Sequence, residues 1–215
     1  MRRLLGLLAL LLACPAAADT LDCALIKSTT DPFELTLDST SVKDGKEPVT
    51  VQTRRQVIRK AGATIVTDIF SGENVFLRRT YNHNAFVTEA YFSTEKVRRV
   101  ASYSVDINKD YLGLGQPFGF TLQMKSEDGK VGSEVNASIS YDGLVDIELG
   151  GCTYRLTKIV TVNKGVSNDK PFSNRSVAWY SRDLKTSLYS HVDNGDGSSF
   201  EFRARGISTN VTPVE

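Results

Sequence analysis

Apolar and polar residues alternate with a period of two along most of this chain, and no other feature restricts the fold as much. The residues from Phe118 to Lys125 follow this alternation, and so do those from Glu134 to Tyr141. Such a pattern predicts strands with one buried face. No window beyond the N-terminal region keeps a helical apolar stripe for three turns. The sequence therefore predicts an all-β protein.

Turn signals separate the alternating segments at intervals of roughly ten residues. Examples are Asp44-Gly45, Ser71-Gly72 and Asp128-Gly129. Short spacers join antiparallel neighbours, because a parallel crossover needs a dozen residues or more. We therefore expect a single-domain antiparallel meander of about 12–14 strands. Since twist accumulates and the apolar face must be covered, the sheet is expected to curl into a half barrel, a spiral or a barrel.

The first eighteen residues predict export. Arg2 and Arg3 precede an apolar run from Leu4 to Leu12, and three alanines end at Ala18. This arrangement is typical of a bacterial signal peptide with a small-residue cleavage site. We expect residues 1–18 to be removed after Ala18 and residues 19–215 to form one all-β domain in the periplasm. The less favoured alternative is that Leu11-Leu12-Ala13-Cys14 is a lipobox, in which case Cys14 would carry a lipid anchor.

Cleavage changes both the charge and the cysteine content of the chain. Removing 18 of the 215 residues leaves 197 and takes away Arg2 and Arg3, so the formal charge moves from +1 to −1. This balance argues against a nucleic-acid partner, which normally requires a strongly basic domain. Two cysteines remain, and in an oxidising compartment Cys23 and Cys152 are expected to form a disulfide. A metal site is the weaker alternative, because closely spaced ligand pairs are absent from the sequence.

Motifs for catalysis or cofactor binding are scarce. Ser190, His191 and Asp193 suggest a hydrolase, but no G-x-S-x-G motif is present, and neighbouring strand residues point to opposite faces. The glycines of 193–197 are typical of a hairpin turn, and the spacing is not that of a calcium loop. The sequence also contains no phosphate-binding loop. We expect no catalytic residues, no metal and no cofactor.

Adjacent arginines occur three times in predicted strands. The pairs are Arg54-Arg55, Arg78-Arg79 and Arg98-Arg99. Each pair should place one guanidinium on each face of the sheet. Arg55, Arg79 and Arg99 are expected to form an anion-binding row on alternate strands, because the planar guanidinium suits carboxylates and phosphates. The alternative is that these arginines reach water from strand ends or pair with Asp68 and Glu89.

A late strand-turn-strand segment, Ala178-Trp179-Tyr180-Ser181-Arg182-Asp183-Leu184-Lys185, resembles uncharacterised periplasmic proteins of proteobacteria. Those proteins build a strongly curved, lipoprotein-carrier-like β-sheet. The resemblance covers a small part of the chain and implies a role in envelope integrity or hydrophobic-ligand binding, without enzymatic activity. The chain departs from the pattern by lacking an obvious covering helix.

These observations predict a monomeric, non-enzymatic periplasmic protein that binds a hydrophobic or anionic envelope ligand, such as a lipid or an envelope polymer. One alternative is a structural module that binds an envelope protein through an exposed strand edge. A minor alternative is a hydrolase using Ser190 and His191. A cavity inside the fold would favour ligand binding, whereas a filled core with a bare edge strand would favour partner binding.

Overall fold

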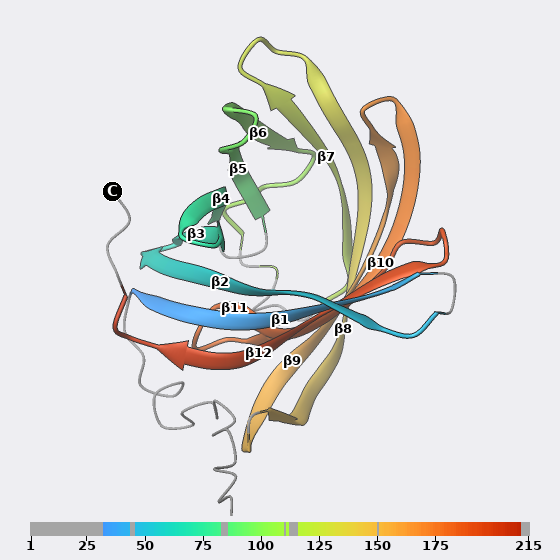
Figure 1. The fold of residues 1–215 in the computed structure, drawn as a ribbon. Coiled ribbons are helices and arrows are strands. Elements are labelled where there is room, and N and C mark those ends of the chain that lie inside the picture. The colour runs from blue at the N-terminus through green and yellow to red at the C-terminus, as the bar shows by residue number, and fades with distance from the viewer. Residues whose placement is uncertain are drawn as a thin grey trace, which may run out of the picture.

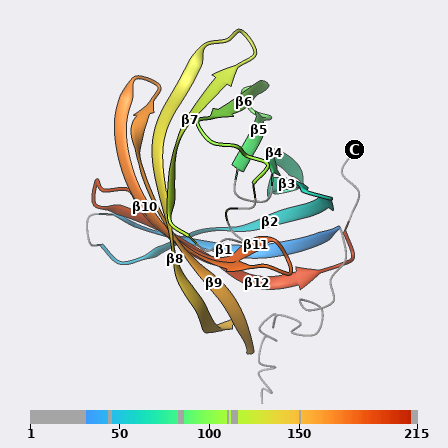
Figure 2. The ribbon, with the colours of Figure 1, turned by 180° about the vertical axis from the view of Figure 1, so that it is seen from behind.

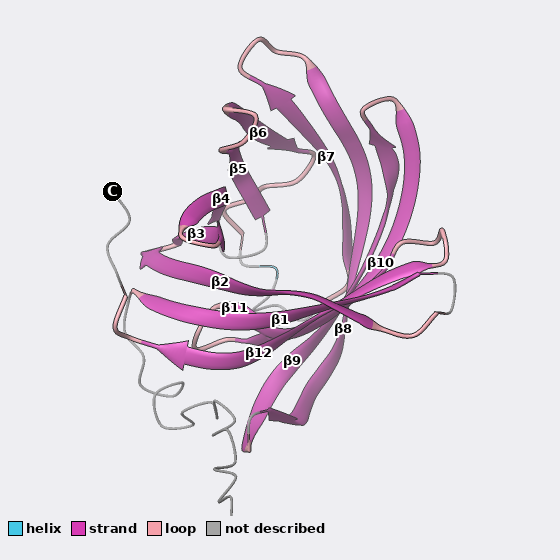
Figure 3. Ribbon diagram, in the orientation of Figure 1, coloured by secondary structure: helices cyan, strands magenta, loops and turns pink. Residues whose placement is uncertain are grey.

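The computed structural model describes residues 32–43, 46–82, 86–109, 111, 116–149 and 151–211. Twelve strands account for most of these residues, as Figure 3 shows. Their bounds are β1 Phe33–Lys43, β2 Val49–Ala61, β3 Thr64–Ser71, β4 Asn74–Asn82, β5 Phe86–Phe92, β6 Val97–Tyr103, β7 Phe118–Ser126, β8 Val131–Leu149, β9 Cys152–Ser167, β10 Lys170–Ser181, β11 Thr186–Asp193 and β12 Ser198–Ser208. In this part of the chain, no helix has the length and apolar character needed to span a membrane.

The twelve strands form a closed barrel. Each strand from β2 to β12 pairs antiparallel with its neighbour in the sequence, and β1 pairs with both β2 and β12. Figures 1 and 2 show β1 and β2 running beside β11 and β12, while β7, β8, β9 and β10 curve away from them. The predicted all-β antiparallel meander is confirmed, and the barrel is the form that its curvature takes.

The alternating residues of each strand divide between the inside and the outside of the barrel. In β1, Phe33, Leu35 and Leu37 are buried, whereas the residues between them are partly exposed. The β2–β3 and β3–β4 hairpins turn tightly at Gly62 and Gly72, both with φ of +62°. Glycine suits these positions because it adopts positive φ without steric cost.

A cluster of buried side chains fills one part of the interior. It includes Phe33, Leu35 and Ile58 from β1 and β2. These side chains pack with Leu188 of β11 and with Leu184, which lies between β10 and β11. The far end of the long β8–β9 hairpin contributes Cys152, Tyr154 and Leu156 to the same cluster. This hairpin therefore supports the core as well as the barrel wall.

Aromatic rings fill the interior beside β5, β6 and β7. Phe86 is fully buried, and its ring centroid lies 5.0 Å from that of Tyr103 and 5.5 Å from that of Phe120. Tyr111, in the connection between β6 and β7, stacks on Phe118 with a centroid distance of 4.4 Å. The Tyr103 hydroxyl donates a hydrogen bond of 2.8 Å to the Val87 carbonyl. Burial raises the pKa of Tyr103, so its phenol stays neutral and keeps this donor.

A β-bulge interrupts the pairing of β3 with β4. Ile69 pairs with Leu77, whereas Phe70 pairs with Val75, so Phe76 is an additional residue in β4. Since side chains alternate with a period of two, one added residue reverses the face of every later position relative to the neighbouring strand. This bulge decides which arginines face the interior.

We expect Gly165→Ala to destabilise the barrel by about 1–3 kcal/mol, because the close packing of β8 and β9 leaves no room for a methyl group. A Cβ atom at Gly165 would overlap the carbonyl oxygen of Glu134 and lie 2.9 Å from Val135 Cα. Urea unfolding of the purified protein measures the effect.

Gly132→Ala is the matched control in the same hairpin, because its Cβ would lie 3.8 Å from the nearest atom, the Met124 carbonyl oxygen. This variant should stay within about 1 kcal/mol of the parent. Equal stability of the two variants would contradict the packing explanation.

Candidate functional site

The register of the strands places one arginine of each pair on each side of the barrel wall. Residues paired across neighbouring strands share a face. Arg54 pairs with Leu37 of the core, and Arg79 and Arg99 both pair with Ala90 of β5. These three arginines therefore lie on the inner face. Their sequence neighbours Arg55, Arg78 and Arg98 lie on the outer face.

The structure therefore separates Arg55 from the predicted row. Arg79 and Arg99 share a face as expected, but the third arginine on that face is Arg54. The physical reason is the bulge at Phe76. If regular pairing continued from Phe70 and Val75, Arg78 instead of Arg79 would lie opposite Thr67, and Arg79 would share the face of Arg55.

Each outer arginine forms an ion pair with a carboxylate. Arg55 lies 3.6 Å from Glu34, and its guanidinium also stacks over the Phe70 ring at 4.0 Å. Burial raises the pKa of Glu34, and the positive charge of Arg55 opposes that rise. Arg98 pairs with Glu89 at 2.6 Å.

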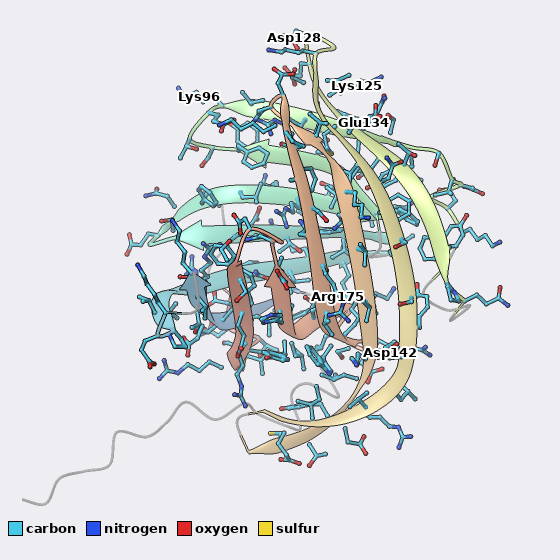
Figure 4. The ribbon with its side chains drawn as sticks, turned by 90° about the vertical axis from the view of Figure 1, so that its right-hand side faces the viewer. Lys96, Lys125, Asp128, Glu134, Asp142 and Arg175 are labelled. Carbon is cyan, nitrogen blue, oxygen red and sulfur yellow. The ribbon has the colours of Figure 1, made fainter. Side chains whose placement is uncertain are left out.

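Asp68 is the most buried carboxylate of these outer ion pairs. Its side chain is fully buried, and it accepts hydrogen bonds from Arg78 Nε, at 2.5 Å, and from Arg59. Asp68 and Glu89 thus pair with arginines, as the alternative interpretation expected, but with the outward Arg78 and Arg98. Figure 4 shows the β7–β10 side of the barrel, where Lys125, Glu134 and Arg175 are labelled on β7, β8 and β10.

The inner arginines have different surroundings. Arg99 lies near the β5–β6 turn, where it pairs with Glu95 at 3.1 Å and stacks over Phe92 at 4.9 Å. Arg54 has its guanidinium carbon 5.8 Å from the centre of the Phe202 ring. The Arg79 side chain has no hydrogen-bond, ion-pair or ring partner among the described residues. Two of the three inner cations therefore lack a carboxylate partner within the described chain.

Arg54 and Arg79 line a cavity of about 630 Å³ in the barrel. The cavity receives side chains from all strands except β6 and β7, whose inner side chains contribute to the aromatic packing instead. Its lining residues are Leu37, Arg54, Gln56, Thr67, Ile69, Phe76, Leu77, Arg79, Tyr81, Phe92, Ile139, Ile159, Thr161, Tyr180, Thr186, Ser187, Ser190 and Phe202. Aliphatic and aromatic side chains, hydroxyl groups and two guanidinium groups are present in this lining, and none of the described residues in it is a carboxylate.

The cavity lies between two groups of packed apolar side chains. Leu37 and Tyr81 belong to the lining and also to the core cluster around Phe33. On another side, Ile69 and Leu77 belong to the lining and to a smaller cluster with Ala90. The cavity walls are therefore held by packed strands.

Ser190 and His191 lie on opposite faces of β11. Ser190 pairs with Ala178 and Phe202 and lines the cavity, whereas His191 pairs with Val177 and Glu201 on the outer face. This geometry does not bring the serine and the histidine together as a triad requires. No group of three metal-ligating side chains that could hold an ion occurs within the described ranges.

The segment after His191 forms a hairpin turn, as its glycines predicted. The Asp193 carboxylate accepts a hydrogen bond from Gly195 N at 2.9 Å, and that of Asp196 accepts bonds from Ser198 N and Oγ. These bonds, the Ser198 hydroxyl first, lower the pKa of Asp196. The carboxylates of the turn therefore stabilise its own backbone.

Only one of the two cysteines predicted to form a disulfide can be placed. Cys152 is buried in the core cluster at the start of β9. Cys23, Cys14 and the predicted signal peptide lie outside the described residues. The disulfide and the cleavage site therefore stay predictions.

No protein-family model and no curated protein matches the chain. Among solved structures, it is similar to the hypothetical lipoprotein YmcC from Escherichia coli, with 11% identity and a TM-score of 0.42 over 92% of this chain and 91% of the other. A Bacteroides fragilis protein described as having a YmcC-like fold has 7% identity and a TM-score of 0.46. The match covers 84% of this chain and 97% of that protein. A Vibrio parahaemolyticus domain named for putative outer-membrane lipoprotein sorting has 10% identity and a TM-score of 0.39. The match covers 88% of this chain and 90% of that domain. At these values the likeness is general, and the function proposed below rests on the chain's own residues.

We expect the double substitution Arg59→Gln and Arg78→Gln to lower the free energy of unfolding by at least about 2 kcal/mol. It leaves the buried Asp68 carboxylate without a cation, and breaking a buried ion pair costs about 3–5 kcal/mol when water cannot enter. Some water can reach Asp68 once the two guanidinium groups are gone, so the lower figure applies.

The control is Arg205→Gln, which removes an ion pair of 3.6 Å with Asp38 between two partly exposed side chains. Such surface pairs contribute about 0–1 kcal/mol. Urea unfolding compares the variants, and a similar small loss in both would show that the Asp68 cluster has no special structural role.

Proposed function

We propose that this protein is an exported, non-enzymatic component of the cell envelope that binds a hydrophobic or anionic ligand inside its barrel. The observation that carries the proposal is the cavity of about 630 Å³, lined by apolar side chains together with Arg54 and Arg79. Ligand sites for small organic molecules usually occupy about 300–1,000 Å³ and combine apolar walls with a few polar groups. The cavity fits this description in both size and lining.

Export and a periplasmic location are part of the same proposal. Their support is the basic start, the apolar run and the alanine cleavage site of residues 1–18. Since a cell envelope is rich in lipids and charged polymers, a cavity with apolar walls and cations suits that compartment.

The two alternative functions receive less support from the fold. Strand addition needs an unpaired strand edge, and closure of the barrel leaves each of the twelve described strands with a neighbour on both sides. A hydrolase would need Ser190 beside His191, but these residues lie on opposite faces. Ligand binding in the interior is therefore the function that the geometry favours.

Native mass spectrometry of protein purified from its own periplasm is expected to show a bound small molecule that organic extraction removes. Ser190→Phe should reduce the bound fraction, because its ring would occupy part of the cavity. His191→Phe is the matched control, since the neighbouring side chain faces outward and should leave binding unchanged.

Melting temperatures of both variants show whether each one is folded. A parent protein that never carries a ligand, or a folded Ser190→Phe variant that carries as much as the parent, would contradict interior binding.

The cysteine pair gives a separate prediction about the exported chain. We propose that Cys23 and Cys152 form a disulfide that attaches the N-terminal region to the core. The loop it would close exceeds 100 residues, for which the chain-entropy model gives about 4–5 kcal/mol of stabilisation. Reduction should therefore lower the melting temperature.

Alkylation under denaturing, non-reducing conditions followed by mass measurement tests this bridge, because denaturation exposes Cys152 whether or not it is bonded. The mature chain should gain no alkyl group before reduction and two after it. Two groups added before reduction would exclude the bridge, and an N-terminus at Asp19 in the same mass would support cleavage after Ala18.

A further inference from the structure

We propose that the ligand is an amphiphile with an oxyanion headgroup, which Arg79 binds inside the barrel with Arg54 as the second cation. The inference rests on the proposed interior binding and specifies the chemical class of the ligand. Its basis is the difference in pairing between the two arginines that line the cavity, Arg54 and Arg79, and their outward-facing sequence neighbours, Arg55 and Arg78.

On the outer face, the three arginines that belong to the adjacent pairs have carboxylate partners. Arg55, Arg78 and Arg98 pair with Glu34, Asp68 and Glu89. In the cavity, and within the described residues, Arg54 has a ring contact but no ion-pair partner, and the Arg79 side chain has no partner. A charge that is partly removed from water needs a counter-charge or hydrogen bonds. The two cavity arginines are therefore available to an external anion.

The residues beside Arg79 explain why the protein itself does not supply that anion. On the two neighbouring strands Arg79 pairs with Thr67 and Ala90, and neither residue is acidic. The nearest carboxylates in register, Asp68 and Glu89, belong to the outer face. Since no carboxylate lines the cavity in the described part of the chain, the fixed charge of this lining is positive.

The shape of the guanidinium group specifies the headgroup further. Its planar fork of N–H donors matches two oxygen atoms of a carboxylate or phosphate, which makes it suited to oxyanions. Hydroxyl groups of Thr67 and Ser190 in the same lining can donate further hydrogen bonds. The shared chemistry is an oxyanion, whether it comes from a fatty acid or from a phosphate ester.

The rest of the lining specifies the other end of the ligand. Ile69, Leu77, Phe92, Ile139 and Ile159 form apolar walls in the same cavity as the two arginines. Burying apolar surface there contributes about 25 cal/mol per Å² removed from water. A free inorganic anion would leave these walls unused, so the ligand is expected to carry an apolar chain as well as the headgroup.

Isothermal titration calorimetry on the extracted, ligand-free mature protein tests the inference with three probes of equal chain length. Laurate and dodecyl phosphate carry the two oxyanions, and dodecanol is the neutral control, each used below its micelle concentration. The parent protein should bind at least one of the oxyanion probes at least about tenfold more tightly than dodecanol, as expected for a charged hydrogen bond. The relative affinity of laurate and dodecyl phosphate distinguishes the two sources.

Four single substitutions locate the anion. Arg79→Gln and Arg54→Gln should each weaken the binding of the preferred oxyanion probe, with the larger loss, at least about tenfold, at Arg79. Both should leave dodecanol binding within about twofold. Arg55→Gln is the matched control, because it removes the neighbouring arginine from the outer face. It should change neither the binding of the oxyanion probe nor that of dodecanol. Arg79→Lys keeps the charge and should retain part of the affinity, which separates a charge effect from misfolding.

The outcomes separate this inference from the function on which it rests. If all three probes bind the parent equally and the arginine variants do not differ, the oxyanion inference is overturned while interior ligand binding stands. If Arg55→Gln weakens oxyanion binding as much as Arg79→Gln, the anion binds outside and the inference is also overturned. If no probe binds and Ser190→Phe is without effect in native mass spectrometry, the proposed function fails as well.

Discussion

The pairing of β1 with both β2 and β12 is the interaction on which the other features of this structure depend. Closure converts a meander with two exposed edges into a wall with an inside and an outside. Every strand residue must then take one of two environments, because side chains alternate along a strand. The buried Phe33, Leu35 and Leu37 of β1 show this division at the closing strand itself. The closed wall also allows a cavity to persist between packed clusters instead of opening to solvent along an edge.

The strand pattern was predictable from the sequence because alternation and turn residues are local signals. The bulge at Phe76 was not, because β4 contains no glycine or proline at this position to indicate it. That one residue decided whether Arg54 or Arg55 shares a face with Arg79. The prediction that Arg79 and Arg99 share a face was unaffected, since β5 pairs with both in one continuous register around Ala90. Errors in the predicted site thus came from register rather than from strand assignment.

The cavity itself could not be predicted from the sequence, because it depends on how side chains from opposite walls meet. Alternation indicates that Phe120 and Ile139 both face inward, but not that Phe120 packs against Phe86 while Ile139 borders open space. Phe86, Tyr103 and Phe120 of β5, β6 and β7 pack against one another and fill the interior there. The cavity lies where the inner side chains of the remaining strands, such as Leu37 and Thr67, line open space. Which inner side chains meet and which do not is a property of the closed barrel and not of any single strand.

Adjacent arginines on a regularly paired strand place one positive charge on the inner face of a closed barrel. A fold selected only for stability would be expected to replace that inner arginine by an apolar residue, because an unpaired cation in a partly dry interior is costly. Arg99 avoids this cost near the β5–β6 turn by pairing with Glu95. Arg79, two strands away in the same register, has no such partner within the described residues, and it borders the cavity. The difference between these two inward arginines is the strongest physical reason to assign a binding role to the cavity and a structural role to the turn.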